Sequence, residues 1–214
     1  MTHERNRTCT ILSAFLGTFL ILTVIIAYSQ YLTLKKTLIA KLSNKATALI
    51  GQKVEIGDIS LSTAAGITIR DIVIRNPEGF IQGDLLRMDR VHLDMRYGEL
   101  FKGRFSFRGI EIDSPQLTLI TGRNGKLNVA DAFIQRLSKK GSSAYQVDGL
   151  KIRNARFALN TDPLFTIGDM DLTMNGVSSV PGTKTTVKLS MAYLGGNRLT
   201  ADAWVFLNDR AKQF

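Results

Sequence analysis

The side chains most often used in catalysis are sparse in this chain of 214 residues. His3 and His92 are its only histidines. His92 lies between two apolar residues of a strand-like segment, with no second histidine nearby to share a metal ion. The single cysteine, Cys9, excludes an intramolecular disulfide. We therefore predict neither a metal site nor a bound cofactor.

Two pairs of carboxylates have a spacing that acid–base catalysis can use. Glu111 and Asp113 are two positions apart, so both project from one face of a strand. Asp169 and Asp171 have the same spacing. Apolar residues alternate with all four, which favours a solvated outer face over a catalytic pair. Residues 122–126 lack the spacing of a phosphate-binding loop and predict a hairpin turn. We expect no catalytic residue and no enzyme activity.

The chain is strongly basic, with a formal net charge of +10 at pH 7. Such a charge suits nucleic acid or an anionic membrane surface, because Lys and Arg gain from phosphate groups in both settings. No run of Lys and Arg is interleaved with aromatic residues, and Cys and His do not have zinc-binding spacing. A membrane is therefore the favoured anionic partner, and nucleic acid is not expected.

An uncharged segment near the N-terminus predicts a membrane anchor. No residue between Arg7 and Lys35 is charged, and residues 11–28 are almost entirely apolar. At about 1.5 Å per residue, about 20 such residues cross the hydrocarbon core of a bilayer. We predict a transmembrane helix over 10–31, after a cytoplasmic tail over 1–9. The residues expected to hold it in the membrane are Ile11, Phe15, Phe19, Leu22 and Ile26.

A cleaved signal peptide is the competing interpretation of this segment. Ala27, Tyr28 and Ser29 have the small-x-small pattern of a cleavage site. The apolar segment is longer than the ~7–15 residues of a usual signal core, and the residues that follow continue a helical pattern. Retention of the helix is therefore favoured, and the sequence leaves cleavage open.

Residues 32–51 predict an amphipathic helix that ends near Gly51. Leu34, Leu38 and Leu42 recur at helical spacing. Such a helix either caps the adjoining sheet or lies on the bilayer surface, and both roles can hold at once. The basic residues expected at the membrane surface are Lys35, Lys36, Lys41 and Lys45. Counted alone, these lysines place the body of the protein in the cytoplasm under the positive-inside rule.

From Val54 onward, apolar residues alternate with polar ones, which is the pattern of half-buried strands. Breaks at 76–79, 97–98 and 113–115 separate short strands. The Asn-Gly dipeptide at 124–125 accepts the positive φ values of a tight hairpin turn. These connections predict strands that are mostly antiparallel.

Past the hairpin, residues 129–137 predict one short helix, and the small polar residues of 138–146 predict a flexible loop. Strands resume over 147–214, so the loop separates them from a first β-region over 52–137. The chain as a whole predicts a mainly β protein. Its expected architecture is a curled, repetitive, mostly antiparallel sheet with an N-terminal transmembrane helix, an amphipathic helix and one short helix.

An internal repeat runs through the strands. Residues 109–119 align without gaps on residues 149–159, and both follow the pattern G-Φ-x-Φ-x-x-(P/A)-x-Φ-x-Φ, where Φ is apolar. The step from Ile112 to Leu117 is odd, so strict alternation would turn these residues to opposite faces. We predict a bend or bulge that returns both to one face.

A shorter likeness relates residues 56–61 to residues 167–172. Repeats of this kind build elongated sheets. One apolar face on such a sheet needs a cover, and the predicted helices are too small to supply it, which leaves a groove open to a ligand. Ordinary core packing is the competing interpretation for each residue of the groove. The residues expected to line it are Ile110, Ile112, Leu117, Leu119, Leu150, Ile152, Phe157 and Leu159.

Three local patterns together resemble the AsmA-like family of bacterial envelope proteins. They are Gly-Gln-Lys-Val-Glu-Ile at 51–56, Ile-Arg-Asn-Pro-Glu-Gly-Phe at 74–80 and Asn-Gly-Lys-Leu-Asn at 124–128. Their order is that of the family's N-terminal region. The repeat is similar to the strand unit of the same family and of its TamB-like relatives. The resemblance therefore covers most of the chain.

The resemblance implies a single-pass anchor in the bacterial inner membrane with the body in the periplasm, and on this basis we favour that orientation over the lysine count. It implies a taco-like curled sheet with an apolar groove. It also implies a role in moving phospholipid towards the outer membrane and in outer-membrane homeostasis. Residues 52–137 correspond to the family's N-terminal β-region, and 147–214 continue the strands of the groove.

Members of this family are usually several times longer than this chain. We therefore expect either an N-terminal fragment or a short member that needs a partner. The expected partners are phospholipid, the inner membrane and another envelope protein at the C-terminal edge of the sheet. The alternative function is a structural scaffold for outer-membrane protein assembly, whose open strand edges recruit another protein by strand addition.

Overall fold

The computed structural model describes most of the chain. The described residues are 2–62, 66–100, 105–122, 125–130, 145–160, 165–193 and 197–206. The chain divides into two compact units, Met1–Lys41 and Leu42–Phe214. Among the residues whose side chains are described, no helix is both long enough and apolar enough to cross a membrane.

One helix, α1 (Thr2–Ile50), occupies the N-terminal part of the chain. From Thr2 onward, the segment predicted as a cytoplasmic tail over 1–9 is part of this helix. The segments predicted over 10–31 and 32–51 are continuous in this helix, because no glycine or proline lies between Gly17 and Gly51 to interrupt the backbone hydrogen bonds. The helix ends at Ile50, directly before Gly51, and its end near Gly51 was predicted. The φ of Gly51 is 78°, and its N–H donates to the carbonyl oxygen of Thr47 at 2.8 Å.

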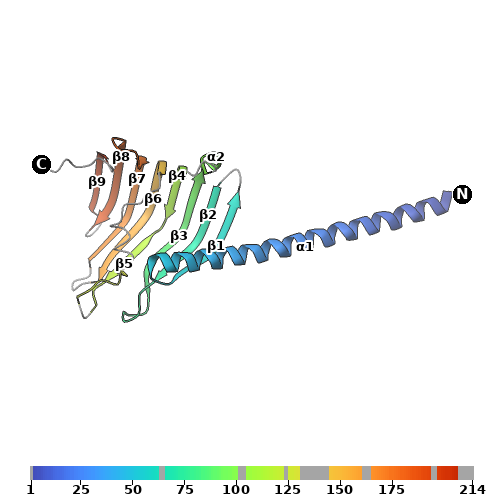
Figure 1. Cartoon of the computed structure of the whole chain (residues 1–214), viewed down its shortest axis with the longest axis horizontal. Helices are drawn as coiled ribbons and strands as arrows, with labels where there is room; N and C mark the ends of the chain where they lie inside the picture. Colours follow the sequence, from blue (N-terminus) through green and yellow to red (C-terminus); the bar gives the residue numbers. More distant parts are fainter. Residues whose placement is uncertain are drawn as a thin grey trace. The chain divides into compact units, whose positions relative to one another are not determined.

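The rest of the described chain forms one nine-stranded sheet (Figure 1). Its strands are β1 (Val54–Ser62), β2 (Gly66–Arg75), β3 (Asp84–Met95), β4 (Phe105–Asp113), β5 (Gln116–Ile120), β6 (Tyr145–Asn160), β7 (Phe165–Ser178), β8 (Lys184–Tyr193) and β9 (Asn197–Phe206). A four-residue helix, α2 (Tyr97–Leu100), follows β3. The short helix predicted over 129–137 and the loop predicted over 138–146 lie mostly outside the described residues.

The strands follow one another across the sheet in the order β1-β2-β3-β4-β6-β7-β8-β9. β4 and β5 form one interrupted strand between β3 and β6, and both run parallel to β6. The other neighbouring strands are antiparallel, so the predicted mainly β, mostly antiparallel sheet is confirmed. The parallel pairing sets the two copies of the repeat side by side in register, from Gly109 beside Gly149 to Leu119 beside Leu159.

A line of residues with left-handed backbone conformation crosses the sheet, and two of them lie at the predicted bulges. The non-glycine residues with positive φ in the described part are Asp71, Ser114, Asn154 and Asp169. We call these four residues the crease. Ser114 and Asn154 occupy the same position in the two copies of the repeat. Asp and Asn adopt this conformation more readily than most residues. The register shifts between Ile152 and Ala155, so the predicted bulge is confirmed.

A small hydrophobic core lies where β1, β2 and β3 meet the end of α1. The buried residues at its centre are Val54, Ile72, Ile74 and Leu85. Ala46 and Ile50 of α1 pack against them, together with Val129. The last turns of the helix thus cap this part of the sheet, which is one of the two roles expected for the amphipathic segment.

Candidate functional site

One face of the sheet is apolar across its whole width. The pairing register aligns one residue from each successive strand into rows that cross the sheet. The first row is Leu61, Ile67, Leu93, Ile110, Leu150, Met174, Val187 and Ala203. The second row is Ile59, Ile69, Val91, Ile112, Ile152, Leu172, Leu189 and Ala201. We call the surface that carries these two rows the apolar face.

The row that lies between these two is polar on every strand. It consists of Ser60, Thr68, His92, Glu111, Lys151, Thr173, Lys188 and Asp202. Because successive side chains of a strand point to opposite sides, this row projects from the other face of the sheet, which we call the polar face. The sheet therefore separates an apolar surface from a charged one.

All eight residues predicted to line a groove are neighbours on β4, β5 and β6. Each pairs with its equivalent in the other copy of the repeat, and all eight side chains are half-buried. The pairs are Ile110–Leu150, Ile112–Ile152, Leu117–Phe157 and Leu119–Leu159. Leu117 and Leu119 also pack against the hydrophobic core, as in the competing interpretation of ordinary core packing. The first two pairs belong to the two rows of the apolar face.

Sequence patterns alone did not identify the other residues of the apolar face. Leu93, Leu172 and Val187, for example, lie in the same rows but on strands outside the repeat. Their alternation with polar residues was a visible signal. Which of them share a row depends on the register between strands, and a single strand does not encode that register.

Little of the described chain covers the apolar face beyond the core. The core takes in residues of β1, β2, β3 and β5, and the end of α1 packs there. Within the described ranges, no second sheet and no helix is stacked on β6, β7, β8 or β9. Exposure rises towards β9, where every residue is exposed. The apolar face is therefore the surface on which a ligand has most to gain.

Ion pairs between neighbouring strands cover the polar face. Arg90 Nε donates to Asp113 Oδ2 at 2.5 Å, and the guanidinium of Arg153 lies 3.2 Å from Glu111. The crossed distances are 3.6 Å for Arg153–Asp113 and 3.8 Å for Arg90–Glu111. Two guanidinium groups thus neutralise the first pair of carboxylates that has catalytic spacing. This arrangement stabilises the pairing of β3, β4 and β6 and offers no free acid or base.

The second pair of carboxylates is divided by the crease. Asp169 has a φ of 47°, so simple alternation does not place it on one face with Asp171. The carboxylate of Asp171 accepts a hydrogen bond from the backbone N–H of Asn154 at 2.9 Å. Asp171 therefore supports the bulge in β6, which is a structural role.

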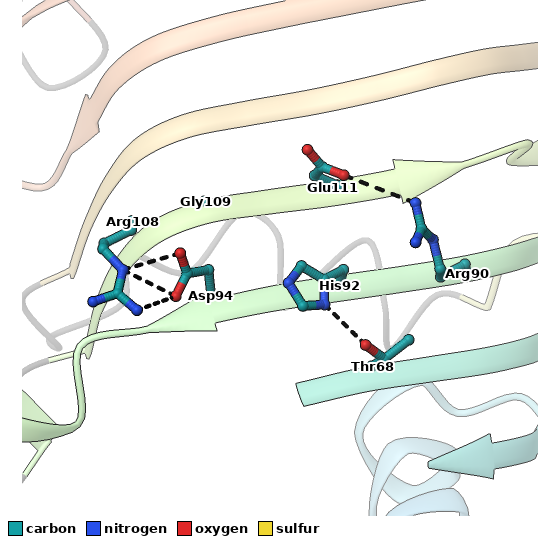
Figure 2. Close-up of a pocket in the computed structure, with 7 residues that line it drawn as sticks. All are labelled: Thr68, Arg90, His92, Asp94, Arg108, Gly109 and Glu111. Carbon is teal, nitrogen blue, oxygen red and sulfur yellow. Dashed lines mark hydrogen bonds and ion pairs between the residues drawn. The ribbon is translucent and has the colours of Figure 1, made fainter. Parts of the chain in front are cut away.

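A shallow hollow of about 420 Å³ lies on the polar face, and Figure 2 shows the residues around it. His92 Nδ1 lies 2.9 Å from Thr68 Oγ1, and Arg108 binds both carboxylate oxygens of Asp94. The guanidinium of Arg108 lowers the pKa of Asp94. No described residue bonds to the other ring nitrogen of His92, so no acid–base triad is formed here. Nor do the described residues contain a cluster of three potential metal ligands.

The three sequence patterns that carry the family resemblance meet in one buried junction. Asn128 is fully buried, and its side-chain amide donates to Asn76 Oδ1 at 2.7 Å and to the carbonyl oxygen of Thr118 at 2.9 Å. Gln52 Nε2 donates to the carbonyl oxygens of Asn128 and Arg75, both at 3.1 Å. These bonds join the end of α1, the turn after β2 and the hairpin after β5.

Arg75 links three strands beside this junction. Its Nη2 lies 2.6 Å from Glu55 Oε2 on β1, and its Nη1 lies 2.5 Å from Asp84 Oδ1 on β3. Hydrogen bonds from Arg75 and then Lys53 lower the pKa of Glu55 from 4.5 to about 2, while the two carboxylates raise the pKa of Arg75. The edge of the sheet next to α1 is thus held by charge as well as by apolar packing.

The predicted membrane residues lie on α1. Leu22 and Ile26 are exposed, whereas the side chains of Ile11, Phe15 and Phe19 lie outside the described part. Of the four basic residues predicted at the membrane surface, one is half-buried and three are exposed. The half-buried residue is Lys35, and the exposed residues are Lys36, Lys41 and Lys45.

Neither protein-family models nor curated proteins match this chain. The chemical character of the sheet is therefore the main guide to function. The apolar face carries no reactive group, and binding of apolar molecules is the chemistry that it supports.

Proposed function

We propose that this protein is an AsmA-like component of the bacterial envelope that holds phospholipid in a taco-like apolar groove. In this role it takes part in phospholipid transport between the inner and outer membranes, and so in outer-membrane homeostasis. The observation that carries the proposal is the apolar face, two rows without a polar residue from β1 to β9. An apolar surface of that extent is typical of an interaction site.

The dimensions of the apolar face suit acyl chains. Strands lie about 4.8 Å apart, so a row across the sheet extends roughly 35 Å. The hydrocarbon core of a bilayer is roughly 30 Å thick, and one acyl chain spans half of it. A row across the sheet is longer than that half thickness. Burial of each CH₂ group contributes about 0.8 kcal/mol, so two acyl chains laid along the rows would bind favourably even when partly exposed.

We further propose that α1 anchors the body in the inner membrane by a single pass, with the sheet in the periplasm. The support is the uncharged segment between Arg7 and Lys35 together with the exposed apolar side chains along it, such as Ile25 at 57% exposure. The exposed lysines that follow, including Lys36 and Lys41, suit anionic headgroups at the membrane surface.

Site-specific photocrosslinking of the full chain in cells tests lipid binding. A photoreactive phenylalanine analogue replaces Ile152 on the apolar face or, as the matched control, Lys151 on the polar face of the same strand. We expect phospholipid adducts, identified by mass spectrometry, at position 152 and not at position 151. A second substitution, Ile112→Asp, should lower the adduct yield at position 152, because the two residues are neighbours. Equal yields at positions 151 and 152 would contradict the proposal.

A scaffold for outer-membrane protein assembly is the second candidate function. The observation that favours it is β9, which pairs only with β8 among the described strands and whose ten residues are all exposed. Open strand edges recruit extended segments of other proteins. The scaffold predicts that photocrosslinks from β9 capture an envelope protein while position 152 captures no lipid.

A further inference from the structure

The outer edge of β9 carries a charge pattern that is complementary to itself. Arg198 and Asp202 lie on the polar face, two residues on either side of Thr200, and all three are exposed. Arg198 Nε donates to Ser190 Oγ on β8 at 2.9 Å, which holds its guanidinium beside the sheet. An antiparallel partner with the same sequence would therefore present an acid opposite this base and a base opposite this acid.

We infer that two copies of this chain associate through β9, antiparallel and around a twofold axis at Thr200. In that register Thr200 of one copy lies opposite Thr200 of the other. Arg198 then lies opposite Asp202 twice, once on each side of the axis. On the other face, Leu199 lies opposite Ala201 twice. Both faces of the edge are thus matched by one arrangement.

Other registers of the same pair are less favourable. A slide by one residue turns the apolar row of one copy onto the polar face of the other. A slide that brings Asp202 opposite Asp202 sets two like charges against each other, which destabilises a pair of strands. A slide by two residues sets Arg198 opposite Trp204 and loses both ion pairs. Charge and alternation together select the register at Thr200.

Pairing through β9 joins the apolar faces of the two copies. Ala201, which ends the second row in one copy, lies opposite the partner's Leu199, so that row continues across the axis, whereas Ala203, which ends the first row, lies opposite the partner's Asn197. The exposed edge would be removed, as proteins generally require of long strand edges. The inference depends on the charges and the alternation of residues along β9, so it holds or fails independently of lipid binding.

Two single-charge variants of the full chain, purified in detergent micelles, test the inference. Arg198→Asp leaves two acids on each edge, and Asp202→Arg leaves two bases. We expect each variant alone to associate at least about tenfold more weakly than the parent protein, measured by sedimentation equilibrium. An equimolar mixture should regain the parent affinity, because every acid of one variant then meets a base of the other. The double variant R198D/D202R should also regain it.

Disulfide formation by single cysteine variants gives an independent measurement of the pairing register. In a Cys9→Ser background, Thr200→Cys should form a disulfide-linked dimer on mild oxidation, because directly paired residues have the Cα separation that a disulfide needs. Lys188→Cys is the matched control, since it is an exposed position of the polar face on β8 and not on β9. It should form no disulfide-linked dimer.

Several results would overturn the inference. They are a monomeric parent protein, single variants that associate as tightly as the parent, a mixture that does not regain affinity, and equal disulfide yields at positions 188 and 200. Open-ended oligomers that depend on β1 would instead indicate head-to-tail pairing of the two sheet edges, which also contradicts a twofold dimer.

Discussion

The side-chain amide of Asn128 donates a hydrogen bond to the side-chain oxygen of Asn76 at 2.7 Å. The bond joins the hairpin after β5 to the turn after β2, two segments that are far apart in the sequence. Asn128 also accepts a hydrogen bond from the backbone N–H of Ile120 at 2.8 Å, and its second donor is bonded to Thr118. Among side chains of this size, the amide alone supplies two donors and an acceptor.

We expect Asn128→Asp to destabilise the protein more than its small change in shape suggests. Aspartate would direct carboxylate oxygens at Asn76 and Thr118, which both present acceptors, and the site is fully buried. The free energy of unfolding should fall by about 2–3 kcal/mol. Urea denaturation followed by circular dichroism measures it. Asn160→Asp, at an exposed position of β6, is the control, and an equal loss there would refute a special role for the junction.

The two Ile-Gly-Asp sequences should respond differently to the same substitution. A Cβ atom at Gly57 would lie 2.7 Å from Cβ of Asp71, a residue of the crease, whereas a Cβ atom at Gly168 would have no neighbour within 4 Å. We expect Gly57→Ala to lower the free energy of unfolding by about 1–3 kcal/mol. Gly168→Ala should change it by less than about 0.5 kcal/mol. Similar values for both would show that Asp71 moves aside without cost.

At Asn154 of the crease, substitution by glycine and substitution by a β-branched residue should change the free energy of unfolding by different amounts. Asn154 has a φ of 52°, which glycine adopts freely and valine resists because its Cβ crowds the following carbonyl oxygen. Asn154→Val should cost about 1–2 kcal/mol of unfolding free energy. Asn154→Gly should be close to neutral. Chemical denaturation of both variants checks the difference, and a fully tolerated valine would mean that the bulge has shifted along β6.

Acid should weaken the sheet through Glu55. Its pKa is lowered from 4.5 to about 2 in the folded protein, so the folded state binds this proton less tightly than the unfolded state. The stabilisation is therefore complete above about pH 4.5 and is lost as the pH falls towards 2. The lowered pKa of Asp94, caused by Arg108, acts in the same direction.

Glu55→Gln should flatten the dependence of the unfolding midpoint on pH across that window. Added salt should flatten it in the parent protein too, because the ion pairs of Glu55 are exposed and are screened. Unfolding midpoints in urea, measured from pH 2 to pH 6, give the slopes of both proteins. Equal slopes for variant and parent would assign the acid sensitivity to other carboxylates.

Local patterns predicted the elements of this fold well, because alternation, turn residues and the glycine at 51 act over a few neighbouring positions. The odd number of positions from Ile112 to Leu117 also predicted the bulge at Ser114. The segments predicted over 10–31 and 32–51 form the single helix α1, as the helical pattern that continues past residue 31 indicates, since a change from apolar to amphipathic pattern does not break backbone hydrogen bonds. Lipid binding and the membrane span stay predictions.

Long-range relations were beyond the reach of those patterns. The repeat was visible, but its parallel pairing, with Gly109 beside Gly149, depends on how β4 and β6 meet in space. The buried bond between Asn76 and Asn128 was hidden for the same reason, although both residues lie in patterns that the sequence singled out. Which residues form a row or meet in a junction depends on the register in which neighbouring strands pair. That register is set by the whole sheet.

The parallel, in-register pairing of the two repeat copies has a consequence for how such a protein can evolve. Tandem duplication of the unit would insert another strand beside its own template, and equivalent positions would again become neighbours. Each row would gain one apolar residue, and no existing contact would need to be reinvented. Selection could in this way tune the length of the surface by copying DNA, one strand at a time.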